Sequence, residues 1–312
     1  MAAPKSPRKG SLQYWPRKRI SKFLPRVNWN ALSNSKNLKG FIVYKAGMAS
    51  VHVKDLTPSS MTKDKKIAIP VTIIECPPMK IFSVRFYKYD KVIGEVLNDG
   101  LDKELKRVVK LPKKSSKKIE DIKGYDDLRI IVYSQVKKTG IKKTPDLTEV
   151  AISGDLEQKL SFVKENLKKE ITIEDVFEKG SLIDFHGLTK GKGLQGPVKR
   201  FGIKLRQHKS EKGVRKVGSV GPWHPRRITF RVPQAGQLGL FTRISYNNKI
   251  ISLGKAENKF KNIKNFGDLK TDYALVRGSI QGPAKRQLLI TSPLRSTKEQ
   301  SKKNYEFIEV VK

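Results

Sequence analysis

The sequence contains a single cysteine, Cys76, among its 312 residues. One thiol cannot form an intramolecular disulfide, and it leaves no cysteine cluster for a zinc site. Because Cys76 lies in an apolar run, we interpret it as a small buried residue. The four histidines, at 52, 186, 208 and 224, lack the spacing of metal ligands. Motifs of serine hydrolases, zinc proteases and phosphate-binding loops are also missing, so the sequence predicts no enzyme activity, no metal and no cofactor.

Long hydrophobic runs are missing too. No stretch approaches the roughly 18 apolar residues that a membrane-spanning helix needs. The first nineteen residues, MAAPKSPRKGSLQYWPRKR, carry charge without a hydrophobic segment, so we expect no signal peptide and no membrane partner. We expect a cytoplasmic protein, or a nuclear one if the cell has a nucleus.

Acidic residues are scarce and unevenly distributed. Twelve Lys and Arg precede the first acid, Asp55, and residues 185–256 hold sixteen Lys and Arg against one acid, Glu211. Residues 90–180 are nearly balanced, with 20 basic and 18 acidic residues. Burying unpaired charges is costly, and solvated protein surfaces usually mix both signs. The excess of cations outside 90–180 therefore predicts a polyanionic partner such as a nucleic acid.

The basic stretch begins with GLTKGKGLQGPVKRFG at 187–202. Its glycines allow backbone to approach a ligand closely, and Phe201, Trp223 and His224 stand among the cations, where their rings can stack on bases. The cations in the loop 187–236 are Lys190, Lys192, Lys199, Arg200, Lys204, Arg206, Lys209, Lys212, Arg215, Lys216, Arg226, Arg227 and Arg231.

The fold class expected is mainly β. Apolar runs at 41–53, 67–76 and 79–89 are β-rich with no helix between them, which predicts an antiparallel sheet or barrel. Ala46-Gly47 indicates a hairpin turn inside the first run, and Pro70 an edge position or a bend in the second.

The nearly neutral middle of the chain has a different pattern. A strand is expected at 128–136 and a short one at 150–153. The apolar spacing in 155–170 predicts a helix. Thr172 with Asp175 resembles a capping box that opens another short helix. We interpret 95–180 as an α/β insertion.

Strand character returns at 181–187. After the loop, 237–254 is expected to form a hairpin that turns at Asn247-Asn248, because Asn tolerates positive φ. Strands at 274–280 and 286–293 complete the core, and the segment NYEFIEVV is expected to add an edge strand.

The glycines at 191–196 match the dinucleotide fingerprint GxGxxG. That site needs a buried parallel strand before the glycines and an apolar-faced helix after them. Here Pro197 leads into a segment of cations, so we reject a dinucleotide site. Gly221-Pro222-Trp223-His224-Pro225 is more specific: it predicts a stiff turn that presents Trp223 at the tip of a basic hairpin. The alternative is that Trp223 anchors the loop to its own domain.

The stretches at 186–202, 213–227 and 232–250 resemble the signature region of the family of universal large-subunit ribosomal protein three, in its archaeal and eukaryotic form. The similarity extends more weakly to the rest of the chain. Phe201 stands where many relatives carry Trp, and Glu211 where relatives carry a basic residue or histidine. Phe201 keeps an aromatic ring at its position. Glu211 puts in doubt any contact or modification that depends on a histidine there.

The resemblance implies a six-stranded split β-barrel of the translation-protein type, with a basic N-terminal arm (1–39), a core (40–94 plus 181–312) that carries the rRNA-binding loop, and the insertion 95–180. It implies a structural constituent of the large ribosomal subunit that binds rRNA, aids assembly and braces the peptidyl-transferase region where aminoacyl-tRNA enters. Neighbouring large-subunit proteins are expected partners, and a homo-oligomer is not. The candidate rRNA-binding residues are Lys190, Lys192, Gly193, Gln195, Lys199, Arg200, Phe201, Lys204, Arg206, Arg215, Lys216, Trp223, His224, Arg226, Arg227 and Gln234 in the loop, with Arg17, Lys18, Arg19 and Arg26 in the arm.

Two other functions remain open on the sequence alone. One is an RNA-modifying enzyme that uses the glycine-rich loop for a nucleotide cofactor. The other is a free RNA-binding module acting on chromatin or mRNA.

Overall fold

The computed structural model describes residues 8–32, 36–112, 118–256 and 260–311. The chain forms two compact units. The loop unit consists of residues 1–22 and 188–242, and the core unit consists of residues 23–187 and 243–312. The mainly β character that the sequence predicts is confirmed.

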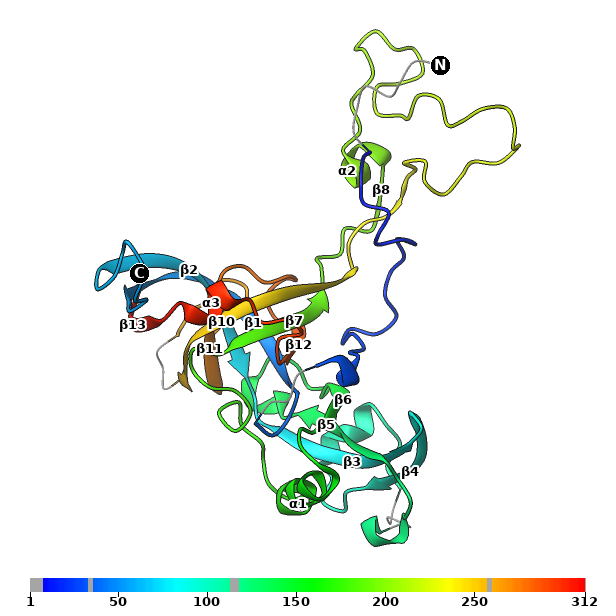
Figure 1. Ribbon diagram of the computed structural model, residues 1–312. Helices are drawn as coiled ribbons and strands as arrows, with labels where there is room; N and C mark the ends of the chain where they lie inside the picture. The colour runs from blue at the N-terminus through cyan, green and yellow to red at the C-terminus, as the bar shows by residue number, and fades with distance from the viewer. Residues whose placement is uncertain (1–7, 33–35, 113–117, 257–259, 312) are drawn as a thin grey trace. The chain divides into compact units, whose positions relative to one another are not determined.

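The larger sheet has the strand order β12-β7-β10-β11-β2-β1-β13 (Figure 1). Strand β12 pairs with both β7 and β1, so the pairing of six strands is circular and β13 lies outside the circle. The edge position predicted for the last strand is therefore confirmed. The strands are β1 (Gly40–Asp55), β2 (Lys66–Cys76), β7 (Leu182–Leu188), β10 (Thr242–Lys255), β11 (Asp272–Arg277), β12 (Gln287–Thr291) and β13 (Tyr305–Val311).

Neither predicted hairpin turn at a strand centre forms. Strand β1 runs through Ala46-Gly47 with only a register shift, and Gly47 instead lets the Ile263 side chain approach: a Cβ there would lie 2.8 Å from it. Strand β10 likewise runs through Asn247 and Asn248. Asn247 does have a positive φ, of 52°, but this directs its backbone N–H to the Asp184 carboxylate at 2.7 Å. Both sequence signals mark irregularities inside long strands.

Pro70 lies where β2 loses one neighbour. Its partner in β1 is Ser50, whereas the pairing of β2 with β11 ends at Val71. The missing N–H of the proline therefore costs no ladder hydrogen bond on the β11 side. The expectation of an edge or bend is met only locally, because β2 as a whole lies inside the sheet.

The smaller sheet has the order β4-β3-β5-β6. We expected residues 79–89 to join the first sheet, but β3 pairs with β4 and β5. The break has a local cause: Pro77 and Pro78 precede β3, and their fixed φ and missing N–H groups prevent a tight hairpin with β2. The strands are β3 (Met79–Lys88), β4 (Lys91–Leu97), β5 (Asp127–Ser134) and β6 (Leu147–Ala151).

Helix α1 (Leu156–Asn166) confirms the helix predicted at 155–170, with reciprocal capping between Asp155 and Gln158. The second predicted capping contact also forms, since the Thr172 N–H donates to Asp175 Oδ2 at 2.8 Å. It closes a single turn rather than a helix.

The two sheets share one hydrophobic core, in which Phe41, Phe86 and Phe185 are fully buried. The Tyr44 hydroxyl of β1 reaches across to the second sheet, where it contacts Ser134 Oγ at 2.7 Å and donates to Asp146 Oδ2 at 2.5 Å. These contacts hold the smaller sheet directly against the larger one.

The N-terminal arm divides between the units. Residues 8–22 belong to the loop unit, whereas Trp29, Leu32 and Leu38 are buried in the core unit. The Trp29 ring lies on Gly40, where an added Cβ would be 2.9 Å from it. An apolar surface of the core therefore covers the aromatic and aliphatic side chains of this second segment. The predicted domain ranges themselves stay a prediction.

His186 provides a test of the core. It is 6% exposed in β7, and its Nε2 lies 3.0 Å from Thr291 Oγ1 of β12. Burial lowers its pKa from 6.5 to about 4. The unfolded chain therefore binds a proton more readily between these values, and the stabilisation from neutral His186 is lost as the pH falls from 6.5 to about 4.

We expect His186→Gln to flatten the pH dependence of the free energy of unfolding by on the order of 3 kcal/mol over that interval. Denaturant titration at several pH values measures it, and His208→Gln, at an exposed position, is the control that should follow the wild type. Parallel curves for His186→Gln and the wild type would contradict the assignment.

Candidate nucleic-acid interface

The base of the loop unit is a short antiparallel neck. Strand β8 (Leu194–Gln195) pairs with β9 (Gly236–Gln237), and the Thr189 N–H donates to the Phe241 carbonyl at 3.0 Å. Gly239, with a φ of 78°, makes the neck possible, because a Cβ there would fall on the Lys190 carbonyl. The glycine-rich sequence thus brings two strands of the same loop together.

The GxGxxG sequence does not build a dinucleotide fold. It is followed by α2 (Pro197–Phe201), five residues that begin with Pro at the first helical position and end at Gly202 in the left-handed conformation. A pyrophosphate-binding fold requires a parallel strand and a long helix, and this segment has neither. Gly193 has a φ of 64° and open space around its Cα.

Arg200 is held inside the loop unit by three backbone carbonyls. Its guanidinium donates to the carbonyls of Gln237 (2.9 Å), Gln234 (3.0 Å) and Arg17 (3.4 Å). Arg17 donates in return to the Arg200 carbonyl at 3.2 Å, and its guanidinium lies 4.3 Å from the centre of the Phe201 ring. Burial lowers the pKa of Arg200, yet an arginine stays charged.

These three residues therefore fasten the arm segment to the loop. The structure brings Arg17, Arg200 and Phe201 together as predicted members of one surface, but it uses them in contacts within the protein. Phe201 is 7% exposed, so its ring packs against Arg17 and is hardly accessible to solvent. Their predicted contacts with rRNA stay a prediction.

Beyond α2, residues 203–235 contain no helix and no strand. The expected hairpin around Trp223 is therefore absent from this segment, all of which the structure describes. Local hydrogen bonds shape it instead. The Arg206 guanidinium donates to the Val217 carbonyl, and the backbone N–H of Arg206 donates to the Val214 carbonyl at 3.1 Å. A long segment without regular structure and with many cations gains little from its own packing.

Most predicted cations of the loop unit are exposed. Across residues 188–242, all of them described, no cation forms an ion pair with a carboxylate. The neighbouring polar candidates include His224, which is exposed, and Gln195, which donates to the Lys192 carbonyl at 2.7 Å. Gln234 is half-buried in the neck. The exposed candidates are Lys190, Lys192, Lys199, Lys204, Arg215, Lys216, Arg226 and Arg227 in the loop, and Lys18 and Arg19 in the arm; Arg26 is exposed in the core unit.

The aromatic side chains of the loop differ in burial. Trp223 is 77% exposed, with the Arg226 guanidinium 5.9 Å from its ring centre, so packing of Trp223 into a core of the loop unit is excluded. Phe230 is 88% exposed and was not among the predicted residues. Its signal in the sequence is an aromatic residue between Arg227 and Arg231 in an acid-poor segment.

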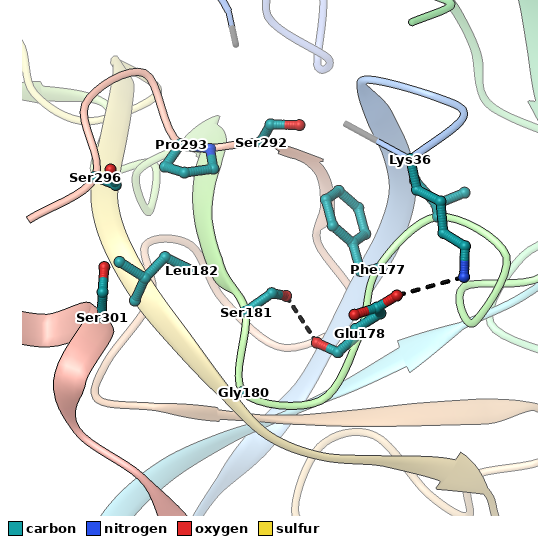
Figure 2. A pocket seen from close by; sticks show the side chains of 11 residues that line it. Lys36, Phe177, Glu178, Gly180, Ser181, Leu182, Ser292, Pro293, Ser296 and Ser301 are labelled. Atoms are coloured by element: carbon teal, nitrogen blue, oxygen red, sulfur yellow. Dashed lines mark hydrogen bonds and ion pairs between the residues drawn. The ribbon is translucent and has the colours of Figure 1, made fainter. Parts of the chain in front are cut away.

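The core unit contains a cavity of about 480 Å³ with a different chemistry (Figure 2). Phe177, Leu182 and Pro293 form its apolar lining. Figure 2 shows the Lys36–Glu178 ion pair, at 3.3 Å, and the Ser181 hydroxyl donating to the Glu178 carbonyl at 2.7 Å. The described lining residues include no histidine or cysteine, and Lys36 is engaged by the Glu178 carboxylate.

Other functional classes find little support in the described part of the chain. There, no group of three or more His, Cys, Asp or Glu side chains is arranged to hold a metal ion. The described helices include none that is long and apolar enough to cross a membrane.

Comparison with known proteins covers nearly the whole chain. The family model described as ribosomal protein L3 matches residues 1–310. The large ribosomal subunit protein uL3 of Methanocaldococcus jannaschii is 39% identical over 306 residues, which cover 93% of this chain and 91% of that protein. The proteins of the same name from Archaeoglobus fulgidus and Methanococcus aeolicus are each 38% identical, over 94% of this chain and 93% and 92% of theirs. The chain therefore belongs to the ribosomal protein L3 family, a family of ribosomal proteins and not of enzymes.

Proposed function

We propose that the chain binds large-subunit rRNA through the exposed cations of the loop unit, helps to order that rRNA during assembly, and braces the region where aminoacyl-tRNA enters the peptidyl-transferase centre. Family membership supports a structural role in the large subunit of the cytoplasmic ribosome, in association with rRNA and other ribosomal proteins. The observation that carries the proposal is the segment 188–242, all of it described, which exposes many cations without one carboxylate partner.

The physical argument is one of charge compensation. Thirteen Lys and Arg in residues 187–236 face one acid, Glu211, and the segment 203–235 lacks regular structure that could hold them apart. Repulsion between these cations falls when phosphates replace water and small ions around them. Phosphate contacts position a protein on RNA without reading its sequence, so the exposed cations provide affinity and the rings provide local fit.

We infer that the core unit supports the loop through its circular strand pairing. The six strands β1, β2, β7, β10, β11 and β12 would constitute the split barrel that the family resemblance implies. Strands β7 and β10 lead directly into and out of the loop unit and are neighbours in the sheet. This arrangement fixes the ends of the basic segment on a rigid element.

The two other functions now have specific tests. An RNA-modifying enzyme would need a cofactor site, and calorimetry with nicotinamide or adenosyl cofactors should show no saturable binding at physiological salt. A free RNA-binding module would stay near the top of a gradient when a cell lysate is sedimented. The proposed function requires that the chain migrate in constant proportion with large subunits.

Salt dependence tests the phosphate contacts. If about ten cations engage, affinity for large-subunit rRNA should fall on the order of 10⁴-fold between about 50 and 200 mM salt. Lys199→Ala should lower the slope of log affinity against log salt by about 1, because Lys199 is exposed in α2. Filter binding of the full chain over a salt series measures both.

Arg200→Ala is the matched comparison at the next position. Because Arg200 donates to three carbonyls, its loss should release the arm from the loop, and we expect faster proteolysis within residues 8–22. Lys199→Ala should leave the proteolysis rate unchanged. Equal salt slopes for wild type and Lys199→Ala would count against a phosphate contact there.

Trp223 should act locally. If its exposed ring stacks on an rRNA base, Trp223→Ala should cost about 1–3 kcal/mol in docking of the loop. Chemical probing of large subunits should then show changed reactivity where aminoacyl-tRNA enters, with a nearly normal yield of subunits. Trp223→Phe keeps a ring and should be milder. A strong assembly defect with unchanged reactivity in that region would contradict this role.

A further inference from the structure

The loop unit contains a cavity of its own, of about 350 Å³. Three segments line it: residues 15–17 of the arm, the end of α2 at Arg200 and Phe201, and residues 228–235 of the loop. Its volume falls within the range of about 300–1,000 Å³ typical of small-molecule sites. It therefore has room for a single planar group but not for a nucleic-acid helix.

Three aromatic side chains line this cavity: Trp15 from the arm, Phe201 from α2 and Phe230 from the loop. Phe201 is 7% exposed and lies against Arg17, which leaves Trp15 and Phe230 as the more accessible rings. Trp15 is half-buried, and its indole N–H donates to the Ser11 carbonyl at 2.8 Å, which sets the orientation of the ring. Phe230 is 88% exposed and lines the cavity from the loop. Exposed aromatic rings next to cations are the usual means of holding unpaired bases of RNA.

The charge of the lining favours the same ligand. Arg17 and Arg200 both line the cavity, and none of its lining residues is acidic. The Arg17 guanidinium donates to the carbonyls of Arg200 and Ser11, and the Arg200 guanidinium donates to those of Gln234 and Gln237, so two positive charges are fixed in place. A purely apolar ligand, such as a side chain of another protein, would gain nothing from these two charges, whereas a phosphate is attracted to both.

We propose that this cavity receives one unpaired base of the rRNA, stacked against Trp15 and Phe230, with its phosphate near Arg17 and Arg200. The proposal rests on the proposed function and deepens it, because it assigns a defined site on the loop to a single nucleotide. It also gives Phe230 a role and makes the arm part of the binding site.

Ultraviolet cross-linking of purified large subunits tests the proposal. After ribonuclease and protease digestion, mass spectrometry should find a single-nucleotide adduct on Trp15 or Phe230, because stacked rings cross-link efficiently to bases. In subunits with Phe230→Ala, the adduct on Trp15 should fall by at least about 5-fold, as expected for the loss of one stacking partner. Phe230→Tyr should keep it.

Leu194→Ala is the matched control. Leu194 is an apolar residue of the loop unit that is 80% exposed and lies outside the cavity lining, so its loss should not change the adduct. Excess free AMP should not reduce the adduct in assembled subunits; a reduction would mean that the cavity takes a diffusible nucleotide instead of an rRNA base.

The outcomes separate the two proposals. Adducts on other peptides of residues 187–236, with none on Trp15 or Phe230, would overturn the base site and leave rRNA binding intact. Adducts on no peptide of the loop unit would overturn rRNA binding itself. A cross-link from this cavity to a neighbouring protein would also overturn the base site. If Phe230→Ala fails to assemble, the adducts of wild-type subunits decide.

Discussion

Backbone carbonyl groups are the partners of three buried or half-buried cations in the described part of the chain. Arg200 uses three carbonyls in the loop unit. In the core unit, Lys249 donates to the carbonyls at the end of α3 (Lys298–Lys302), and Lys45 donates to those of Ile280 and Gly282. Burial lowers the pKa of Lys249, which shows the cost of its position. A carbonyl compensates a cation by its dipole and adds no negative charge.

That choice of partner explains how a chain of net charge +37 folds and still keeps its charge available. If the loop unit binds rRNA as proposed, carboxylate partners there would neutralise the surface that attracts the phosphates. Around the smaller sheet the opposite solution is used: Arg85 of β3 pairs with Glu95 and Glu149, and Lys159 of α1 pairs with Asp127. Acids are thus frequent around the smaller sheet and scarce in the loop unit, which is the distribution that the proposed function requires.

Much of the fold could be predicted, because strands depend on local alternation and helix α1 on local periodicity. The positions that failed depend on distant residues. Gly47 leaves room for the Ile263 side chain, and the Asn247 backbone N–H donates to the Asp184 carboxylate. Neither residue forms the turn that its type suggests. Phe230 escaped prediction because only the path of residues 228–235 past the arm makes it part of a cavity.

Two adjacent cations show most clearly what the sequence alone could not predict. Lys199 and Arg200 are equivalent in composition and context, yet one is exposed and the other donates to carbonyls up to 183 residues away in sequence. Because Arg200 joins the arm to the loop, the exposed Lys18 and Arg19 belong to the same unit as the loop cations. Under the proposed function, a phosphate bound by the arm would also restrain the loop, so the two contributions to affinity would be coupled rather than additive. Removal of the Arg200 side chain should therefore weaken the phosphate contacts of both the arm and the loop. Removal of the Lys199 side chain should remove only the contact that Lys199 itself makes.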